Sequence, residues 1–308
     1  MNDPRPVTPS APLFRDPVYD GAADPAIVWN RNERAWWILY TNRRATAPAI
    51  GKSWLHGTRI GVASSHDGGA TWVYRGTVGG LEFEPGTNTF WAPEVLFHDG
   101  LYHMYASYVR GVPTTWEYDR RIVHYTSDDL WSWRLESVLD LDSPRVIDAA
   151  VHELPEGGWR MWYKDEGHSS HTYAADSDDL FTWRVAGPVV TEFGHEGPNV
   201  FRWRGAYWLI ADYWKGQLVM RSEDCRSWVR QADILDTPGT RHEDNDVGRH
   251  ADVLVRGEEA YVFYFTHPGR ETGDPRRSSL QVARLDLDAE GSLVCDRDAR
   301  FSLDLGRP

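Results

Sequence analysis

Cysteine is scarce in this 308-residue sequence: Cys225 and Cys295 are the only two, and they lie far apart in the chain. Zinc sites and disulfide frameworks need more cysteines at closer, repeated spacings. The sequence therefore predicts two free thiols.

Long apolar runs and an excess of positive charge are also absent. No stretch approaches the roughly 20 apolar residues of a transmembrane helix. The formal net charge is −13, which argues against nucleic acid or an anionic membrane as a partner. Residues 1–17 are polar and rich in proline and lack the basic and apolar regions of a signal peptide, so we expect a cytoplasmic protein. Its oligomeric state is left open.

Aromatic residues, by contrast, are abundant, at 13% of the chain with 16 tryptophans. Tryptophan and tyrosine fill β-rich cores and also form surfaces on which sugar rings stack. Judged by β-preference alone, most of them belong to a core.

A polar turn that closes on tryptophan recurs four times. The four copies are SHDGGATW (65–72), TSDDLWSW (126–133), DSDDLFTW (176–183) and RSEDCRSW (221–228). Aligned on the tryptophan, Asp67, Asp128, Asp178 and Glu223 share one position. The first copy matches the Asp box, a hairpin turn of β-propellers in which short polar side chains bond the local backbone.

Each turn lies within a longer repeated unit. An apolar strand, a tight turn and an aromatic-rich strand begin at DPAIVWN, APEVLFH, DAAVHEL, EGPNVFR and HADVLVR. A third strand precedes the tryptophan turn and a fourth follows it. Five such units predict an all-β protein, a five-bladed β-propeller with four antiparallel strands per blade. We expect one domain over residues 1–308, with residues 1–20 as an N-terminal extension.

The first strand of each blade lines the central channel of a propeller. Aligned on their apolar residues, the five first strands place Asp24, Ala92, Asp148, Gly197 and His250 at one position. Glu196 lies one residue earlier, at the position of Trp91. Three acids and a histidine are thus expected at one mouth of the channel, where clustered carboxyl groups perturb one another's pKa values as acid–base chemistry requires.

These motifs resemble glycoside hydrolase family 43, through Asp24-Pro25, Trp91 to Glu94, Ile147-Asp148 and Glu196 to Pro198. That family and its clan relatives are five-bladed propellers. The resemblance implies that Asp24 is the general base, that Glu196 is the general acid, and that Asp148 orients this acid and raises its pKa. It further implies a structural calcium ion near His250 at the channel centre, with no other cofactor required.

Loops between the second and third strands fall on the same rim and carry candidate sugar-binding side chains. Together with Trp91, these candidates are Trp54, His56, Trp116, Lys164, His168, His171, Trp214 and His267. The loop 42–58 and the connection 237–250 are long, and long loops over a channel mouth favour a closed pocket and an exo-acting enzyme.

The sequence therefore predicts an inverting, exo-acting glycosidase that removes a terminal pentose (arabinofuranose or xylose), or a similar sugar, from oligosaccharides. Three alternatives stay open. A propeller phosphorylase would hold phosphate through Lys164, His168 and His171. A relative of the neoagarooligosaccharide hydrolases would use a histidine as the acid in place of Glu196. A non-catalytic propeller would bind sugars without cutting them.

Overall fold

The computed structural model describes residues 8–269 and 274–308, which form five sheets of four antiparallel strands each. The first blade is β1 (Ala22–Asn30), β2 (Ala35–Asn42), β3 (Arg59–Ser65) and β4 (Val73–Thr77). The second is β5 (Thr89–His98), β6 (Leu101–Val109), β7 (Arg121–Ser127) and β8 (Arg134–Val138). The third is β9 (Val146–Glu153), β10 (Trp159–Asp165), β11 (His171–Ser177) and β12 (Arg184–Val190). The fourth is β13 (Glu196–Trp203), β14 (Ala206–Asp212), β15 (Gln217–Ser222) and β16 (Val229–Arg230). The fifth is β17 (Arg249–Arg256), β18 (Glu259–Thr266), β19 (Ser279–Leu287) and β20 (Leu293–Val294).

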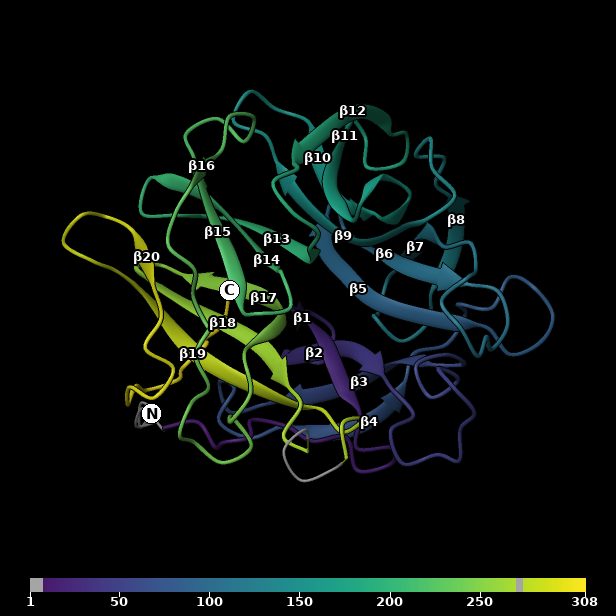
Figure 1. Cartoon of the computed structure of the whole chain (residues 1–308), viewed down its shortest axis with the longest axis horizontal. Helices are drawn as coiled ribbons and strands as arrows, with labels where there is room; N and C mark the ends of the chain where they lie inside the picture. The colour runs from purple at the N-terminus through teal and green to yellow at the C-terminus, as the bar shows by residue number, and fades with distance from the viewer. Residues whose placement is uncertain (1–7, 270–273) are drawn as a thin grey trace.

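The five sheets form a closed ring, with the first strand of each sheet innermost (Figure 1). The inner strands contact one another in cyclic order, β1 with β5, β5 with β9, β9 with β13, β13 with β17, and β17 with β1. The predicted five-bladed propeller is therefore confirmed. The short 3-10 helix η1 (Glu166–His168) is the one helical element of the described ranges, and nothing helical there is long and apolar enough to cross a membrane.

All five inner strands carry a β-bulge at the position that the sequence alignment picked out. The extra residues lie at Asp24, Ala92, Asp148, Gly197 and His250, where pairing with the second strand shifts register. The first four have φ values of +50°, +43°, +59° and +56°. A left-handed backbone at a non-glycine residue costs about 1–3 kcal/mol and is concentrated at functional sites, and bulges re-aim side chains. The bulges thus lie together at one rim of the ring, where the inner strands begin.

Tryptophan and tyrosine fill the layers between blades. Trp37 lies in the layer between the first and second blades, Trp162 between the third and fourth, and Trp208 between the fourth and fifth. These three side chains are completely or almost completely buried. The aromatic richness of the sequence therefore serves the core to a large extent.

The tryptophan turns form as expected, but the aligned acid is wrong in three of the four. In the first turn, Asp67 accepts hydrogen bonds from the backbone and hydroxyl of Thr71. In the other three, the acceptor is the next residue along, namely Asp129, Asp179 and Asp224. The first turn is one residue longer between its serine and its tryptophan, so an alignment on tryptophan displaced the carboxylate.

The two ends of the chain close the ring without exchanging a strand between blades. Leu13 and Phe14 pack beside Leu280 of β19, with a backbone bond of 2.8 Å from Leu13 N to Leu280 O. Leu305 packs in the same layer and its N donates to Gly68 O at 2.9 Å. This layer joins the fifth blade to the first.

Candidate active site

A cavity of about 230 Å³ opens where the five inner strands begin. Its inner-strand residues are Asp24, Trp91, Ile147, Asp148, Glu196 and His250. Its remaining residues, from second strands and loops, are Arg43, Leu55, Trp116, Lys164 and Glu166. The three acids that sequence alignment placed at one mouth of the channel thus line one cavity.

Asp24 is a buried carboxylate held by an arginine. Arg43 Nη2 donates to both carboxylate oxygens, at 3.0 and 3.2 Å. His250 Nδ1 lies 3.7 Å from Asp24 Oδ1. This contact from one guanidinium nitrogen to both oxygens fixes the carboxylate's orientation.

Asp148 occupies the least solvated position of the three. Its Oδ2 accepts a hydrogen bond of 3.1 Å from Gly197 N, and its own N donates to Ser107 Oγ at 2.9 Å. Burial and the nearby negative charge of Glu196 raise the pKa of Asp148 to about 6, although His250 and Lys164 oppose this rise. Asp148 therefore keeps its proton up to about pH 6 and is ionised above it.

Glu196 is the more exposed acid, with 30% of its side chain accessible, and it is paired with a lysine. Lys164 Nζ lies 3.0 Å from Glu196 Oε2. Burial acts to raise the pKa of Glu196, but the attraction and hydrogen bond of Lys164 outweigh it, so the pKa is lowered. Lys164 also lies 3.0 Å from Glu166 Oε1, and Glu166 in turn pairs with the buried Arg120.

A fourth acid, Asp212, lies opposite Glu196 on the neighbouring strand β14. Asp212 is fully buried and accepts hydrogen bonds from Trp214 N at 2.7 Å and His250 N at 3.2 Å. Burial and the charge of Glu196 raise the pKa of Asp212 to about 7. It ties the fourth blade to the backbone of His250.

An aromatic wall forms one side of the cavity. Trp91 Nε1 donates to Leu55 O at 2.6 Å, which fixes the ring. Trp116 is 44% exposed at the mouth. The buried His56 packs behind both, with ring centroids 5.1 Å from Trp91 and 5.9 Å from Trp116. His56 thus supports the wall and is not among the lining residues.

The other candidate sugar-binding residues do not line the cavity. Trp54, His168, His171, Trp214 and His267 lie outside it. His168 Nδ1 pairs with Asp165 at 2.8 Å, and His267 Nδ1 contacts Arg277 O at 2.8 Å. Trp214 is 45% exposed, and its ring contacts Lys164.

Four residues of this region are not among the predicted site residues or motifs: Arg43, Leu55, Glu166 and Asp212. Arg43 and Asp212 share a recognisable place, because one follows the second strand of its blade directly and the other ends it. A charged residue at the end of a second strand could therefore have indicated both of them from the sequence.

His250 lies between the blades that carry Glu196 and Asp24. A side chain added at Gly197 would place its Cβ 2.4 Å from the His250 ring, so glycine is required there. Calcium takes about six to eight oxygen ligands, whereas His250 offers one imidazole nitrogen. The described residues contain no group of three or more His, Cys, Asp or Glu side chains that could hold a metal. The side chains present here do not fit a calcium site.

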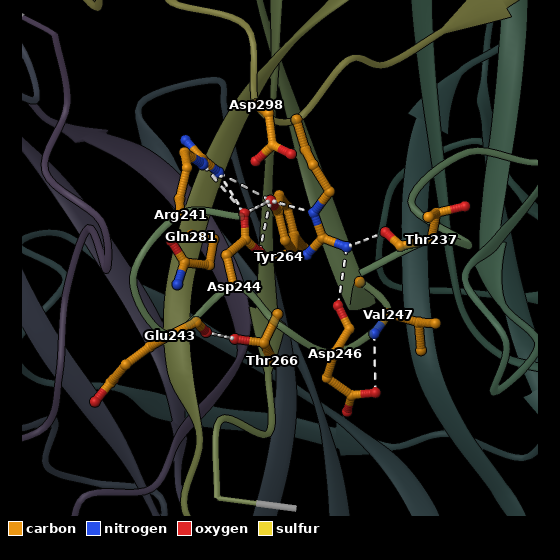
Figure 2. Close-up of polar contacts among 12 residues, drawn as sticks. Thr237, Arg241, Glu243, Asp244, Asp246, Val247, Tyr264, Thr266, Gln281 and Asp298 are labelled. Carbon is orange, nitrogen blue, oxygen red and sulfur yellow. Dashed lines mark hydrogen bonds and ion pairs between the residues drawn. The ribbon is translucent and has the colours of Figure 1, made fainter. Parts of the chain in front are cut away.

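The connection that leads into β17 is anchored by a buried ionic network (Figure 2). Asp244 is fully buried and pairs with Arg297 and, at 2.8 Å, with Arg241. Tyr264 Oη of β18 donates to the same carboxylate at 3.0 Å. This network fixes the loop just before Arg249 and His250 and so fixes one edge of the cavity.

Comparison with solved structures finds close matches to this propeller at low sequence identity. One match is a glycoside hydrolase family 43 β-xylosidase/α-arabinofuranosidase from a compost microbial metagenome, in complex with xylotriose and in a calcium-free form. It superposes with a TM-score of 0.69 at 16% sequence identity, and the match covers 93% of this chain and 98% of that one. A family 43 enzyme from Xanthomonas citri complexed with xylotriose gives 0.68 at 16% identity, covering 94% and 93%. A family 43 β-1,3-galactosidase with galactodeoxynojirimycin gives 0.67 at 13%, covering 89% and 93%.

These matches define the class of fold: the chain has the five-bladed β-propeller of glycoside hydrolase family 43 structures. Neither protein-family models nor curated proteins give a match.

Proposed function

We propose that this propeller is an inverting, exo-acting glycoside hydrolase that releases a terminal pentose (arabinofuranose or xylose), or a similar sugar, from short oligosaccharides. The observation that carries the proposal is the meeting of Asp24, Asp148 and Glu196, from three different inner strands, in one small cavity. Two of the similar structures hold xylotriose, which supports an oligosaccharide substrate.

Asp24 is the general base of the proposed reaction. Arg43 orients its carboxylate, which lines the cavity. The base removes a proton from a water molecule as that water attacks the anomeric carbon. Inversion needs about 6.5–9.5 Å between the two carboxyl groups. Residues on separate blades, such as Asp24 on β1 and Glu196 on β13, suit this spacing better than neighbours on one strand.

Glu196 is the proposed general acid, which protonates the leaving oxygen. It is the most accessible of the three acids, as a group that must reach the departing sugar should be. Asp148 lies beneath it and binds the backbone of Gly197. A negative charge at Asp148 favours the protonated form of Glu196, and this is the pKa-raising role implied by the family resemblance.

The dimensions of the cavity favour exo action. Its volume of about 230 Å³ falls below the roughly 300–1,000 Å³ of sites for drug-sized ligands. One sugar ring fits such a space better than a chain of several. Trp91 and Trp116 offer apolar faces for the C–H surface of that ring.

The alternatives are less well supported by the site. A phosphorylase needs cations free to bind phosphate, but Arg43, Arg120 and Lys164 are each paired with a carboxylate. A histidine acid from the third-blade loop needs access to the cavity, but His168 and His171 do not line it. The buried His195, next to Glu196, has both ring nitrogens engaged, by Thr172 and by Phe193 O. Calcium has no part in the proposal, because the side chains around His250 do not suit it.

Hydrolysis of 4-nitrophenyl pentosides and furanosides, with and without inorganic phosphate, tests the function. We expect phosphate-independent release that Asp24→Asn lowers by about 10²–10⁴-fold, the usual contribution of a general base. Glu196→Gln should lose as much on unactivated oligosaccharides of the same sugar, whose leaving oxygen needs a proton, and less on 4-nitrophenyl glycosides, whose leaving group does not. Proton NMR of the first product should show the anomer opposite to that of the substrate. Asp128→Asn, on an exposed turn, serves as the control. Full activity of either site variant on these oligosaccharides would overturn the assignment, and strict dependence on phosphate would favour the phosphorylase.

A further inference from the structure

Lys164 joins the proposed proton donor to a carboxylate that the proposed reaction does not use. Its Nζ lies 3.0 Å from both Glu196 Oε2 and Glu166 Oε1, and its side chain is 5% exposed. Glu166 is paired on its other side with the buried Arg120. An ionic chain therefore runs from Arg120 through Glu166 and Lys164 to Glu196.

This chain conflicts with acid catalysis in the empty site. A carboxylate that accepts a hydrogen bond from an ammonium group is stabilised in its charged form, whereas a general acid must carry a proton. The leaving oxygen also has to approach Glu196, one of whose two carboxylate oxygens, Oε2, already bonds Lys164. Protonation of Glu196 removes the charge that holds Lys164 there and so weakens this contact.

Glu166 reduces the free-energy cost of breaking the contact between Lys164 and Glu196. An unpaired buried ammonium group is strongly destabilising, but Lys164 already has a second carboxylate partner, Glu166, at the same distance as Glu196. Arg120 holds Glu166 in place, through a guanidinium group that also donates to Trp116 O at 2.7 Å. The aromatic wall, the arginine and the second carboxylate thus form one rigid support.

We propose that Lys164 is a positioning residue that keeps Glu196 ionised in the empty pocket and shifts its contact to Glu166 when a sugar enters. Glu196 then takes up one proton from solvent and becomes competent to donate it. This inference rests on the proposed function of Glu196 as the acid. Proton uptake is thereby coupled to occupation of the pocket.

Other charged groups also face Glu196 from every element packed around it. These groups are Asp148 on β9, Asp212 on β14, His250 on β17, Arg43 after β2, and the adjacent His195. Asp148 and Asp212 oppose its ionisation, while Arg43 and His250 favour it. Lys164 is the one cation of the described residues that hydrogen-bonds to its carboxylate, so removing Lys164 should have the largest effect.

Two substitutions should shift the titration of Glu196 in opposite directions. Lys164→Met removes the ammonium and should raise the Glu196 pKa by about one unit or more. Glu166→Gln leaves the ammonium with Glu196 alone and should lower it. Carbon-13 NMR of labelled glutamate side chains, assigned through Glu196→Gln, reports this pKa directly. The alkaline limb of the pH profile of kcat/KM should move the same way.

Lys215→Met is the matched control, because Lys215 is exposed on the same rim and should leave the Glu196 titration unchanged. Opposite shifts in the two site variants support the inference, and an absent shift or shifts of one sign overturn it. If Lys164→Met fails to fold, the inference is tested by Glu166→Gln alone: a lowered Glu196 pKa supports it, and an unchanged or raised pKa overturns it. If the wild-type protein cleaves no glycoside, the proposed function fails, while the NMR titration still tests the ionic chain.

Discussion

At the scale of single residues, Asp148 shows how a site for acid–base chemistry weakens the fold that carries it. Its pKa of about 6 lies above the ordinary value of 3.8 because the carboxyl is buried beside Glu196. The folded protein therefore binds a proton at Asp148 more tightly than the unfolded chain does. The associated stability is complete below pH 3.8 and is lost as the pH rises through about 6.

Asp148→Asn should consequently stabilise the protein at pH 8 while abolishing activity. The amide keeps an oxygen for the hydrogen bond from Gly197 N and removes the buried charge. A shift of two pKa units corresponds to roughly 2–3 kcal/mol, so calorimetry should show a higher Tm at pH 8 and little change at pH 4. Asp67→Asn provides the opposite case, because hydrogen bonds from Thr71 and Ser65 lower the pKa of Asp67 despite its partial burial. That variant should lose stability at pH 8, and a lower Tm for Asp148→Asn at pH 8 would contradict this account.

The inner-strand acids could be predicted from sequence because one bulge recurs at the same place in every blade. Asp24 and Asp148 share that place, and Glu196 precedes it by one residue. Glu166 and Asp212 could not be predicted in this way. Glu166 lies in the short helix η1 and Asp212 at the end of the second strand β14. In these places the apolar pattern indicates burial but not which neighbouring blade a side chain faces.

At the scale of structural elements, the tryptophan turns show the limit of aligning a motif by its letters. The turn at 126–133 contains two adjacent aspartates, and hydrogen bonding alone distinguishes them. Asp129 accepts bonds of 2.8 Å from Trp131 N and Ser132 N, whereas Asp128 is exposed. A repeat counted from tryptophan finds the turn but selects the wrong acid.

Asp129→Ala should therefore destabilise the protein by about 1–3 kcal/mol, because two backbone donors lose their partner. Asp128→Ala, one residue away on the same turn, should change the free energy of unfolding by less than about 0.5 kcal/mol. Urea denaturation of the two variants measures the difference. Equal losses would mean that this turn does not depend on the observed carboxylate.

A buried histidine pair between β6 and β7 makes the second blade sensitive to acid. His103 Nδ1 and His124 Nε2 lie 3.0 Å apart, which requires one nitrogen to be unprotonated. Burial and repulsion from His98 lower the pKa of His103 to about 4, and burial and repulsion from His103 lower the pKa of His124 to about 3. Their neutral forms stabilise the fold fully above pH 6.5, and this contribution falls as the pH drops below 6.5.

The double variant His103→Asn/His124→Gln should lose this pH dependence. Asparagine and glutamine place amide groups near the two hydrogen-bonding nitrogens but do not titrate. Between pH 7 and pH 5 the wild-type protein should lose on the order of 2 kcal/mol per histidine that the variant retains. The Tm measured across this range provides the comparison, and parallel Tm curves would show that the pair has no such role.

At the scale of the whole molecule, the ring must be closed between its first and last blades. Every sheet consists of strands that are consecutive in the chain, so no shared sheet joins the two ends. Closure depends on the contact between β1 and β17 and on the apolar layer that receives both terminal segments. The sequence repeats predict the blades but not the place of these terminal segments, because a few apolar residues without periodicity do not indicate their partner.

Phe14→Ala and Leu305→Ala should therefore weaken closure from opposite ends of the chain. Both side chains are buried in this layer, and such truncations typically cost about 2–5 kcal/mol. Leu135→Ala, at an exposed position of β8, is the control and should cost less than about 0.5 kcal/mol. Hydrogen exchange should locate the effect: amides of β17 to β19 and of β1 to β3 should lose protection, while those of β9 to β11 keep theirs at low denaturant. A uniform loss of protection would show instead that the five blades unfold as one unit. If the two substitutions lower the free energy of unfolding no more than Leu135→Ala does, the inner strands close the ring without these side chains.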